Sequence, residues 1–521
     1  MDKFTEKRIE QLREAKDIAL KGGGEKKLAA QRAKGKMTAR ERLDYLLDEG
    51  SFEEIGPLFG YIDGCPTDGL ITGFGTINGK TVCVYSQDYT VKGGSVGAQN
   101  GRRMYITVEK ALELKVPFIG LHDSPGARLP NIKESKTAYG DLLEKSGGSL
   151  FYPNTQASGV IPQISAMLGS CAGLSVYSPA LTDFIYMVDK KSHMYITGPL
   201  MVKTVTGEDL THDELGGAEV HCKVSGVADG RFASEKELLD GIKDLLSYLP
   251  QNMDEKPPEV NLKDDPERMV DEVMDIIPSK PSKAYDVREV IKVIADGGRF
   301  FEIKSEFAGE IVVGFGRLDG KTVGFVANQP KVYSGSMTVD SSDKQTRFIR
   351  FCDCFNIPIV LLIDTPAYMP GSDQEHRGII RHGAKVLYAL CEATVPRIAI
   401  VMRKAYGGGN LGMGTVPGMG TDLIYYWPIV EVGVLGAPAS VMLHFGKEIK
   451  AAENPKEMHK QKMEEYMSKY ANPIREASGN WAITDVIEPR QTRKLLIRNL
   501  KYLSTKKRAS HQKKRHGNIP L

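Results

Sequence analysis

The segment "GFGTINGKTVCVYSQDYTVKGGSV" at residues 73–96 decides the fold, because a second copy of it follows later in the chain. That copy, "GFGRLDGKTVGFVANQPKVYSGSM", occupies residues 314–337 at an offset of 241 residues. The same offset aligns "VPFIGLHDSPGARLP" with "IPIVLLIDTPAYMPG", so that Asp123 corresponds to Asp364. Self-similarity at a fixed, long period indicates a duplicated structural unit.

Two further blocks repeat in the same order. The segment "VIPQISAMLGSCAGLSVYS" aligns with "TVPRIAIVMRKAYGGGNLGM" at an offset of 234 or 235, and "LTDFIYMVD" aligns with "GTDLIYYWP" at 239. Short runs rich in Val, Ile and Phe alternate with helix-length segments, which is typical of an α/β fold with buried parallel strands. We therefore predict two tandem α/β domains at residues 59–255 and 256–521, joined near a Pro-rich, charged linker at 249–269.

The first 58 residues predict a helical arm. Residues 4–23 carry apolar side chains at helical intervals and end in glycines, and a second helix begins after Thr38 and stops at Gly50. The two "GFG" segments lie between strands without a helix after them, so they predict hairpin turns and not a dinucleotide site.

Composition excludes several classes of protein. The chain has 521 residues and a formal net charge of +3, and it contains no apolar run long enough to cross a membrane. The N-terminus lacks the apolar core of a secretory signal, so we expect a cytoplasmic protein. Seven thinly spread cysteines favour reduced thiols, and Cys352 with Cys354 lacks a second pair at zinc spacing, so no metal site is predicted. The basic run at residues 506–521 lacks interleaved aromatic residues and predicts no nucleic-acid partner.

In each half, an apolar strand runs into a glycine-containing turn and then a helix. Small residues let a ligand approach the backbone, and the N–H groups at a helix start attract negative charge, which suits an oxyanion hole. A tight strand-to-helix turn without function is the alternative for a single copy, but the turn occurs twice. There is no Walker phosphate loop, no H-E-x-x-H and no Cys-x-x-Cys, and none of the ten histidines belongs to an evident ligand set. Backbone donors without a clear base fit chemistry that passes through an enolate.

Several motifs carry a family resemblance. Among them are "KGKMTARERLDYLLDEGSFEEI", "GLHDSPGARLP", "ITGPLMVKTVTGEDLTHDELGGAEVH" and "PGSDQEHRGIIRHGAKVLYALCEATVP". Together they resemble the carboxyltransferase subunits of biotin-dependent acyl-CoA carboxylases, of the propionyl-CoA carboxylase and methylmalonyl-CoA carboxyltransferase type. The resemblance implies two tandem crotonase-like domains, an N-terminal one for acyl-CoA and a C-terminal one for biotin. It also implies a reaction that moves a carboxyl group between biotin N1 and the α-carbon of an acyl-CoA through a thioester enolate.

The resemblance also implies roles for individual residues. The backbone N–H groups of Gly173 and Leu174 would hold the thioester oxygen, although Leu174 stands where the family pattern has a second glycine. Biotin would meet Tyr406 and the N–H groups of Gly408 and Gly409.

Three further positions, Asn410, Leu411 and Arg128, are expected near the substrate, and a fourth, Arg377, is left open. Asn410 and Leu411 follow the biotin turn, and Leu411 replaces the acid of propionyl-type members. An apolar pocket residue favours a longer acyl chain, but one methylene discriminates by only about 1–3 kcal/mol. Arg128, with the basic arm, is a candidate for contact with CoA, and a solvated role is equally open. Arg377 either faces water or meets a substrate carboxylate.

The expected partners follow from what the sequence lacks. It has no biotinyl-lysine motif and no ATP-binding signature, so a separate biotin carboxyl carrier protein and a biotin carboxylase subunit, or the membrane subunits of a decarboxylase, must complete the complex. The resemblance implies a homo-hexamer. Two alternatives remain open: the α-subunit of a biotin-dependent methylmalonyl- or glutaconyl-CoA decarboxylase, and a catalytically silent assembly scaffold.

Overall fold

The computed structural model describes residues 2–128, 150–278, 280–507 and 516–520. The chain divides into two compact units, Met1–Glu255 and Lys256–Leu521, and the division falls inside the Pro-rich linker. In the part of the chain that the structure describes, no helix combines the length and apolarity needed to cross a bilayer.

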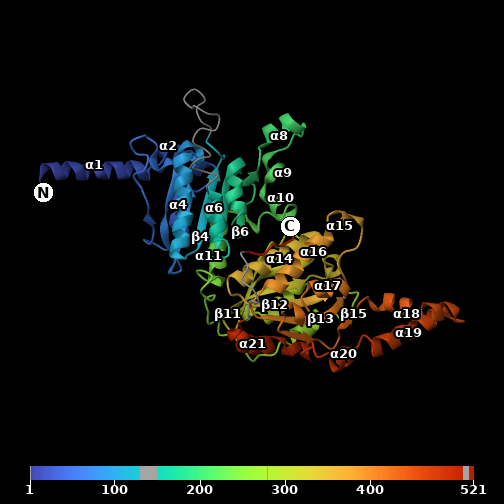
Figure 1. Cartoon of the computed structure of the whole chain (residues 1–521). Coiled ribbons are helices and arrows are strands. Elements are labelled where there is room, and N and C mark those ends of the chain that lie inside the picture. Colours follow the sequence, from blue (N-terminus) through green and yellow to red (C-terminus); the bar gives the residue numbers. More distant parts are fainter. Residues whose placement is uncertain (1, 129–149, 279, 508–515, 521) are drawn as a thin grey trace. The chain divides into compact units, whose positions relative to one another are not determined.

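Unit 1 is built on a mixed sheet, in which Figure 1 labels β4 and β6. The strand order is β1-β2-β3-β4-β5-β6-β8, and β7 pairs with β5. Strands β3 to β6 run parallel, whereas β2 and β3 form an antiparallel hairpin. The strands are β1 Glu53–Glu54, β2 Leu70–Ile77, β3 Lys80–Gln87, β4 Phe118–Ser124, β5 Gln163–Ala172, β6 Phe184–Val188, β7 His193–Tyr195 and β8 Gly230–Phe232.

Unit 2 repeats this topology. Its sheet has the order β16-β14-β13-β12-β11-β10-β9, with β15 paired to β13. The strands are β9 Phe300–Ile303, β10 Ile311–Leu318, β11 Lys321–Asn328, β12 Ile359–Thr365, β13 Arg397–Tyr406, β14 Leu423–Tyr426, β15 Glu431–Gly433 and β16 Asp485–Val486. The expected α/β duplication is therefore confirmed.

Both predicted hairpins are present. The turn residues Asn78 and Gly79 have φ of 50° and 75°, and Asp319 and Gly320 have 53° and 75°. Positive φ at both central residues is the turn geometry that matches the twist of two antiparallel strands. Neither "GFG" segment opens a helix, so neither forms a dinucleotide site.

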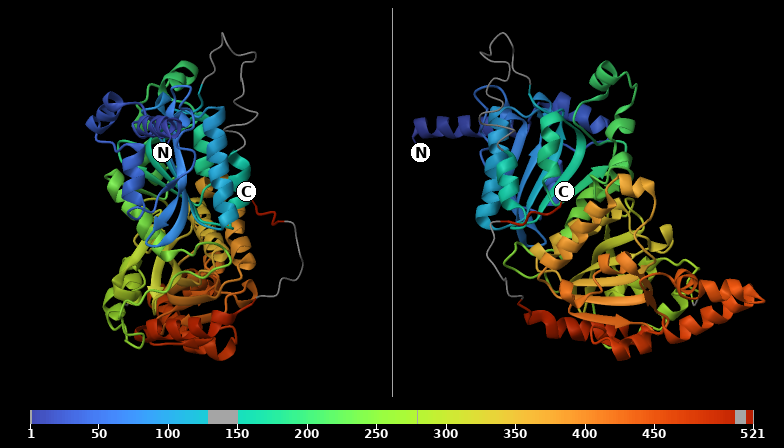
Figure 2. Two further views of the ribbon diagram at one scale, coloured as in Figure 1. Left: turned by 90° about the vertical axis from the view of Figure 1, so that its left-hand side faces the viewer. Right: turned by 45° about the vertical axis from the view of Figure 1, so that its right-hand side comes forward.

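Helices α4 and α6 lie side by side against the sheet of unit 1 (Figure 2). The apolar face of α4, with Met104 and Val108, packs on Cys83 and Tyr85 of β3. A separate pair, α3 and α11, packs together elsewhere in the unit. The helices of unit 1 are α1 Lys3–Leu20, α2 Glu25–Ala33, α3 Ala39–Leu46, α4 Ala98–Leu114, α6 Phe151–Ala157, α7 Tyr177–Ala180, α8 Pro199–Thr206, α9 His212–Gly216, α10 Ala218–Lys223 and α11 Glu235–Tyr248.

The predicted arm is helical, with one difference in length. Thr38 caps α3, and its side chain and that of Glu41 form a reciprocal capping box. The helix ends at Leu46, four residues before the expected stop at Gly50, because Leu47 is already in an extended conformation.

In unit 2, α14 packs on α16 and on β10, and α18 packs on α19. The helices of this unit are α12 Glu272–Ile276, α13 Val287–Ile294, α14 Val339–Cys354, α15 Ser372–His376, α16 Ile379–Glu392, α17 Gly407–Gly412, α18 Ala437–Ala451, α19 Pro455–Lys469, α20 Pro473–Gly479 and α21 Thr492–Tyr502.

Candidate functional site

The first glycine turn follows β5. Gly173 has φ of 59° and opens the short 3-10 helix Gly173–Val176, whose N-terminus receives no side-chain cap. The first N–H groups of a helix have no partner within the helix, so they are available to an acceptor. Leu174 is not among the residues with positive φ, so a side chain at this position adds no backbone strain. This explains why leucine is tolerated where the family pattern has glycine.

The second turn follows β13. Gly407 has φ of 49° and begins α17, which also lacks a side-chain cap. A Cβ at Gly409 would lie 2.9 Å from the carbonyl carbon of Ala367, so only glycine fits against that backbone. The N-terminal end of α17 thus offers uncapped donors on a closely packed turn.

The strand registers show which residues are equivalent in the two units. In unit 1, His122 of β4 pairs with Met167 of β5, and in unit 2, Ile363 of β12 pairs with Val401 of β13. His122 and Ile363 are equivalent at the offset of 241 residues, so Met167 is equivalent to Val401. The offset between β5 and β13 is therefore 234 residues. Gly173 is therefore equivalent to Gly407, and Leu174 to Gly408. The donors expected at the biotin turn, Gly408 and Gly409, thus begin one residue after the counterpart of Gly173. The donor roles of this pair and of Gly173 and Leu174 remain predictions.

The side chains around the second turn differ in burial and in hydrogen bonding. The Tyr406 hydroxyl donates to Glu431 Oε2 at 2.5 Å, and burial raises the pKa of Tyr406. The Oδ1 atom of Asn410 is buried and has no hydrogen-bond partner among the described residues, whereas Leu411 is 45% exposed. Of these two side chains, Leu411 is the one that a ligand at this turn could reach.

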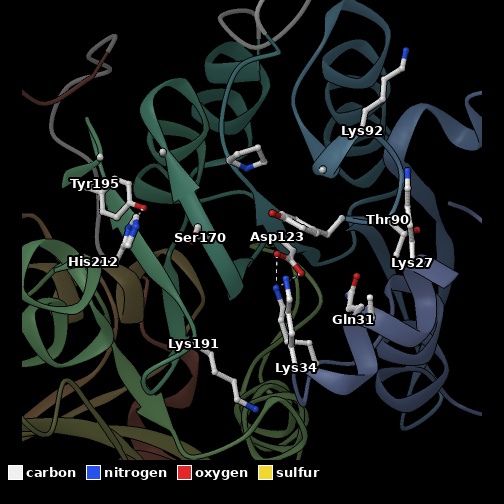
Figure 3. A pocket seen from close by; sticks show the side chains of 17 residues that line it. Lys27, Gln31, Lys34, Thr90, Lys92, Asp123, Ser170, Lys191, Tyr195 and His212 are labelled. Carbon is white, nitrogen blue, oxygen red and sulfur yellow. Dashed lines mark hydrogen bonds and ion pairs between the residues drawn. The ribbon is translucent and has the colours of Figure 1, made fainter. Parts of the chain in front are cut away.

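A cavity of about 760 Å³ lies in unit 1, beside Ala172 at the end of β5. Figure 3 shows lysine side chains on the wall of this cavity, where the side chains of Tyr195 and His212 approach each other. Among the described lining residues Asp123 is the one carboxylate, and it is already paired. The lysines are Lys27, Lys34, Lys36, Lys92 and Lys191. The cavity therefore presents positive charge to an anionic ligand.

Asp123 anchors the arm beneath this cavity. Its carboxylate is 1% exposed and lies 2.6 Å from Lys36 Nζ and 3.0 Å from the Arg42 guanidinium. Arg42 is fully buried and donates two further hydrogen bonds, each of 2.9 Å, to Glu235 of α11. Burial lowers the pKa of Lys36.

The equivalent carboxylate in unit 2 is neutralised differently. Asp364 receives a 2.9 Å hydrogen bond from Arg403 of the neighbouring strand. The residue equivalent to Arg403 in unit 1 is Gly169, where a Cβ would lie only 2.0 Å from Asp123 Oδ1. The glycine leaves the space that Lys36 of the arm occupies, so the arm forms part of the wall of the unit 1 cavity.

Arg128 does not line the cavity. Its guanidinium pairs with Asp68 at 2.6 Å and donates to the Ser95 hydroxyl at 3.0 Å. The side chain holds together the loops around residues 68 and 95, and its expected contact with CoA remains a prediction.

The other candidates also have local partners. Arg377 pairs with Asp340 at 2.6 Å, and Cys352 is buried while Cys354 is exposed. Within the described residues, no group of three or more His, Cys, Asp or Glu side chains could hold a metal ion. Most of the C-terminal basic run, residues 508–515, lies outside the described residues.

Sequence reasoning missed Ser170, Tyr195 and His212, which the fold brings to the same cavity. They come from β5, β7 and α9, and their spacing along the chain matches no catalytic motif. The parallel pairing of β7 with β5 brings Ser170 and Tyr195 together, and the packing of α9 on β7 adds His212.

Comparison with known proteins identifies a carboxyl transferase domain over residues 30–519. A Haloferax mediterranei protein named propionyl-CoA carboxylase, carboxyltransferase subunit, is 49% identical over 99% of both chains. A Propionigenium modestum protein named methylmalonyl-CoA decarboxylase subunit alpha is 43% identical, also over 99% of both. The solved structure of transcarboxylase 12S, a hexamer with methylmalonyl-coenzyme A and methylmalonic acid bound, matches with a TM-score of 0.92 and 45% identity over 99% of this chain and 98% of that one. The expected fold of two tandem crotonase-like domains is thereby confirmed, and the chain belongs to the carboxyl transferase domain family.

Proposed function

We propose that this protein is the carboxyltransferase subunit of a biotin-dependent acyl-CoA carboxylase. It moves a carboxyl group between biotin on a separate carrier protein and the α-carbon of an acyl-CoA. The acyl-CoA occupies the lysine-lined cavity of unit 1, and biotin meets the turn at Gly408 and Gly409 in unit 2.

The observation that carries this proposal is the cavity itself. Five lysines line it, and Ala172 on its wall directly precedes the uncapped turn at Gly173. Coenzyme A carries several phosphate charges at one end and the thioester at the other, so basic side chains and backbone donors match its two ends.

The chain's own residues would act through position and hydrogen bonding. The N–H groups of Gly173 and Leu174 donate to the thioester oxygen and stabilise the negative charge that develops on it in the enolate. The turn in unit 2 fits the ureido ring, because its N–H groups are uncapped and Asn410 Oδ1 is a buried acceptor for which the described residues supply no donor. Biotin supplies the carboxyl group and the base for the α-proton.

The test is carboxyl exchange with the purified full-length protein. We expect labelled carboxyl groups to pass between free biotin and acetyl-, propionyl-, butyryl- or methylcrotonyl-CoA. Transfer to none of these esters would overturn the proposal and favour the scaffold alternative.

A charge test addresses the cavity. Replacing Lys27 and Lys92 with Met should raise the KM for acyl-CoA by about 2- to 30-fold, because an exposed charge pair contributes about 0.2–1 kcal/mol. Lys26→Met is the matched control, because Lys26 neighbours Lys27 on α2 but does not line the cavity. Equal effects of the pair and the control would remove the cavity from the proposal.

The second candidate is the α-subunit of a biotin-dependent decarboxylase, which the relative from Propionigenium modestum favours. The same site would run the transfer step in reverse. Co-purification from the native organism with a multi-span membrane subunit would support this candidate, and co-purification with an ATP-dependent biotin carboxylase would support the carboxylase. For either enzyme we propose a homo-hexamer, which mass photometry of the purified protein would test.

A further inference from the structure

Ser170, on the wall of the unit 1 cavity, has no part in the carboxyl transfer proposed above. It lies directly opposite His193 in the parallel register of β5 and β7. The Ser170 hydroxyl is 3.5 Å from His193 Nδ1, and His193 Nε2 is 3.1 Å from Asp213 Oδ1 of α9. A serine, a histidine and a carboxylate thus stand in line, with the imidazole in the middle.

The electrostatics suit a base at His193. Its side chain is 14% exposed, and burial lowers the pKa of His193, so the imidazole is neutral at neutral pH. When Nε2 carries the proton and donates it to Asp213, Nδ1 is left as the acceptor that faces Ser170. This is the order of roles that activates a serine nucleophile on unrelated folds.

The duplication shows that the scaffold does not require this cluster. In unit 2 the residues equivalent to Ser170 and His193 are Lys404 and Glu431, which are paired in the corresponding register. Glu431 accepts the hydroxyl of Tyr406 instead. The serine–histidine pair therefore occurs in unit 1 and not at the equivalent positions of unit 2.

The cluster also lies close to the turn whose backbone donors are predicted to hold the thioester oxygen. Three residues after Ser170, the uncapped turn at Gly173 offers backbone N–H groups. Tyr195 and His212 line the same cavity, where the Tyr195 hydroxyl is 2.7 Å from His212 Nδ1 (Figure 3). A nucleophile on the cavity wall and backbone donors three residues further along the chain are the parts that acyl transfer needs.

We propose that Ser170, His193 and Asp213 form a relay that hydrolyses the thioester of a bound acyl-CoA to a carboxylic acid and CoA. The proposal rests on the proposed function, which places the acyl-CoA in this cavity. Ser170 Oγ attacks the thioester carbonyl while its proton passes to His193; the C–S bond breaks, and the CoA sulfur leaves with that proton. Water then attacks the Ser170 ester with His193 as the base, the C–O bond to serine breaks, and Ser170 regains its proton as the acid departs. No oxidant or reductant is needed.

The experiment measures release of free CoA thiol from propionyl-CoA by the full-length protein without biotin. Binding of propionyl-CoA is first measured by calorimetry. We expect thiol release by the wild type, a fall of about 100-fold or more in Ser170→Ala, and about tenfold or more in Asp213→Asn. Asp209→Asn is the matched control, because Asp209 is an exposed carboxylate near α9 that pairs with Lys203. Acid quench and mass spectrometry should find a propionyl group on the peptide that contains Ser170.

The outcomes separate the two proposals. If neither propionyl-CoA nor the acetyl, butyryl and methylcrotonyl esters bind, both are overturned; if propionyl-CoA alone fails to bind, thiol release is measured with an ester that does bind. If it binds but no thiol is released, or if Ser170→Ala releases it as fast as the wild type, the relay alone is overturned. Binding together with the acyl-serine and Ser170-dependent release supports both.

Discussion

Neutralising the buried carboxylate of Asp123 should loosen the arm of unit 1. In Asp123→Asn, Lys36 and Arg42 lose a partner at 2.6 and 3.0 Å, while Arg42 keeps its two bonds to Glu235. Removing one member of a buried ion network costs about 3–5 kcal/mol, because it leaves an uncompensated buried charge. The remaining pair to Glu235 places the expected loss at the lower end, about 3 kcal/mol.

Hydrogen exchange at the amides of α3 and α11 measures this loss. A change of about 3 kcal/mol corresponds to exchange roughly 150-fold faster, at 1.36 kcal/mol per factor of ten. Both tryptophans, Trp427 and Trp481, lie in unit 2, so their fluorescence is an internal control that should not change. Asp209→Asn, an exposed carboxylate, should cost less than about 1 kcal/mol.

A double variant sharpens the test. Adding Lys36→Met to Asp123→Asn removes the unpaired ammonium group, so part of the lost protection should return. The reasoning is refuted if Asp123→Asn behaves like Asp209→Asn, or if the double variant loses the sum of the two single losses.

The remaining predictions concern the turns, the acyl pocket and pH. Gly409→Ala should abolish most carboxyl transfer, because its Cβ would lie 2.9 Å from the Ala367 backbone. Gly408→Ala should lose less transfer activity, because its Cβ would lie 3.4 Å from a side-chain atom of Tyr368. An exchange assay that finds the reverse order of activities would refute this. Leu411→Asp should shift the ratio of kcat/KM values toward propionyl-CoA, and an unchanged ratio would remove Leu411 from the pocket. Burial lowers the pKa of His122 to about 3, so below pH 6.5 this histidine becomes protonated in the unfolded chain but stays neutral in the folded chain. The free energy of unfolding should therefore fall by about 1.6 kcal/mol between pH 6.5 and pH 5 from this group, and denaturant titrations of His122→Leu should lack that part of the fall.

Much of the fold can be predicted from the sequence, because repeats and turn residues are local signals. The duplication, the hairpins at Asn78–Gly79 and Asp319–Gly320, and the Thr38 cap follow from short stretches whose conformation depends on near neighbours. The helix after Thr38 ends earlier than expected because an extended Leu47, and not Gly50, stops it. Helix ends depend on packing as well as on the capping residue.

The candidate site, like the fold, has parts that the sequence predicts and parts that only the tertiary structure reveals. The sequence by itself determined the family and the two glycine turns, since strand, glycine and helix are consecutive in the chain. Only the tertiary structure decided that Gly173 is equivalent to Gly407, because strand register is set by pairing across the sheet. Tertiary contacts likewise bring Lys36 to Asp123, 87 residues away in the sequence, and His193 to Ser170, 23 residues away. Electrostatic contacts and proton transfer depend on distance in space, so side chains far apart in the chain become a site only when the sheet and the arm have packed.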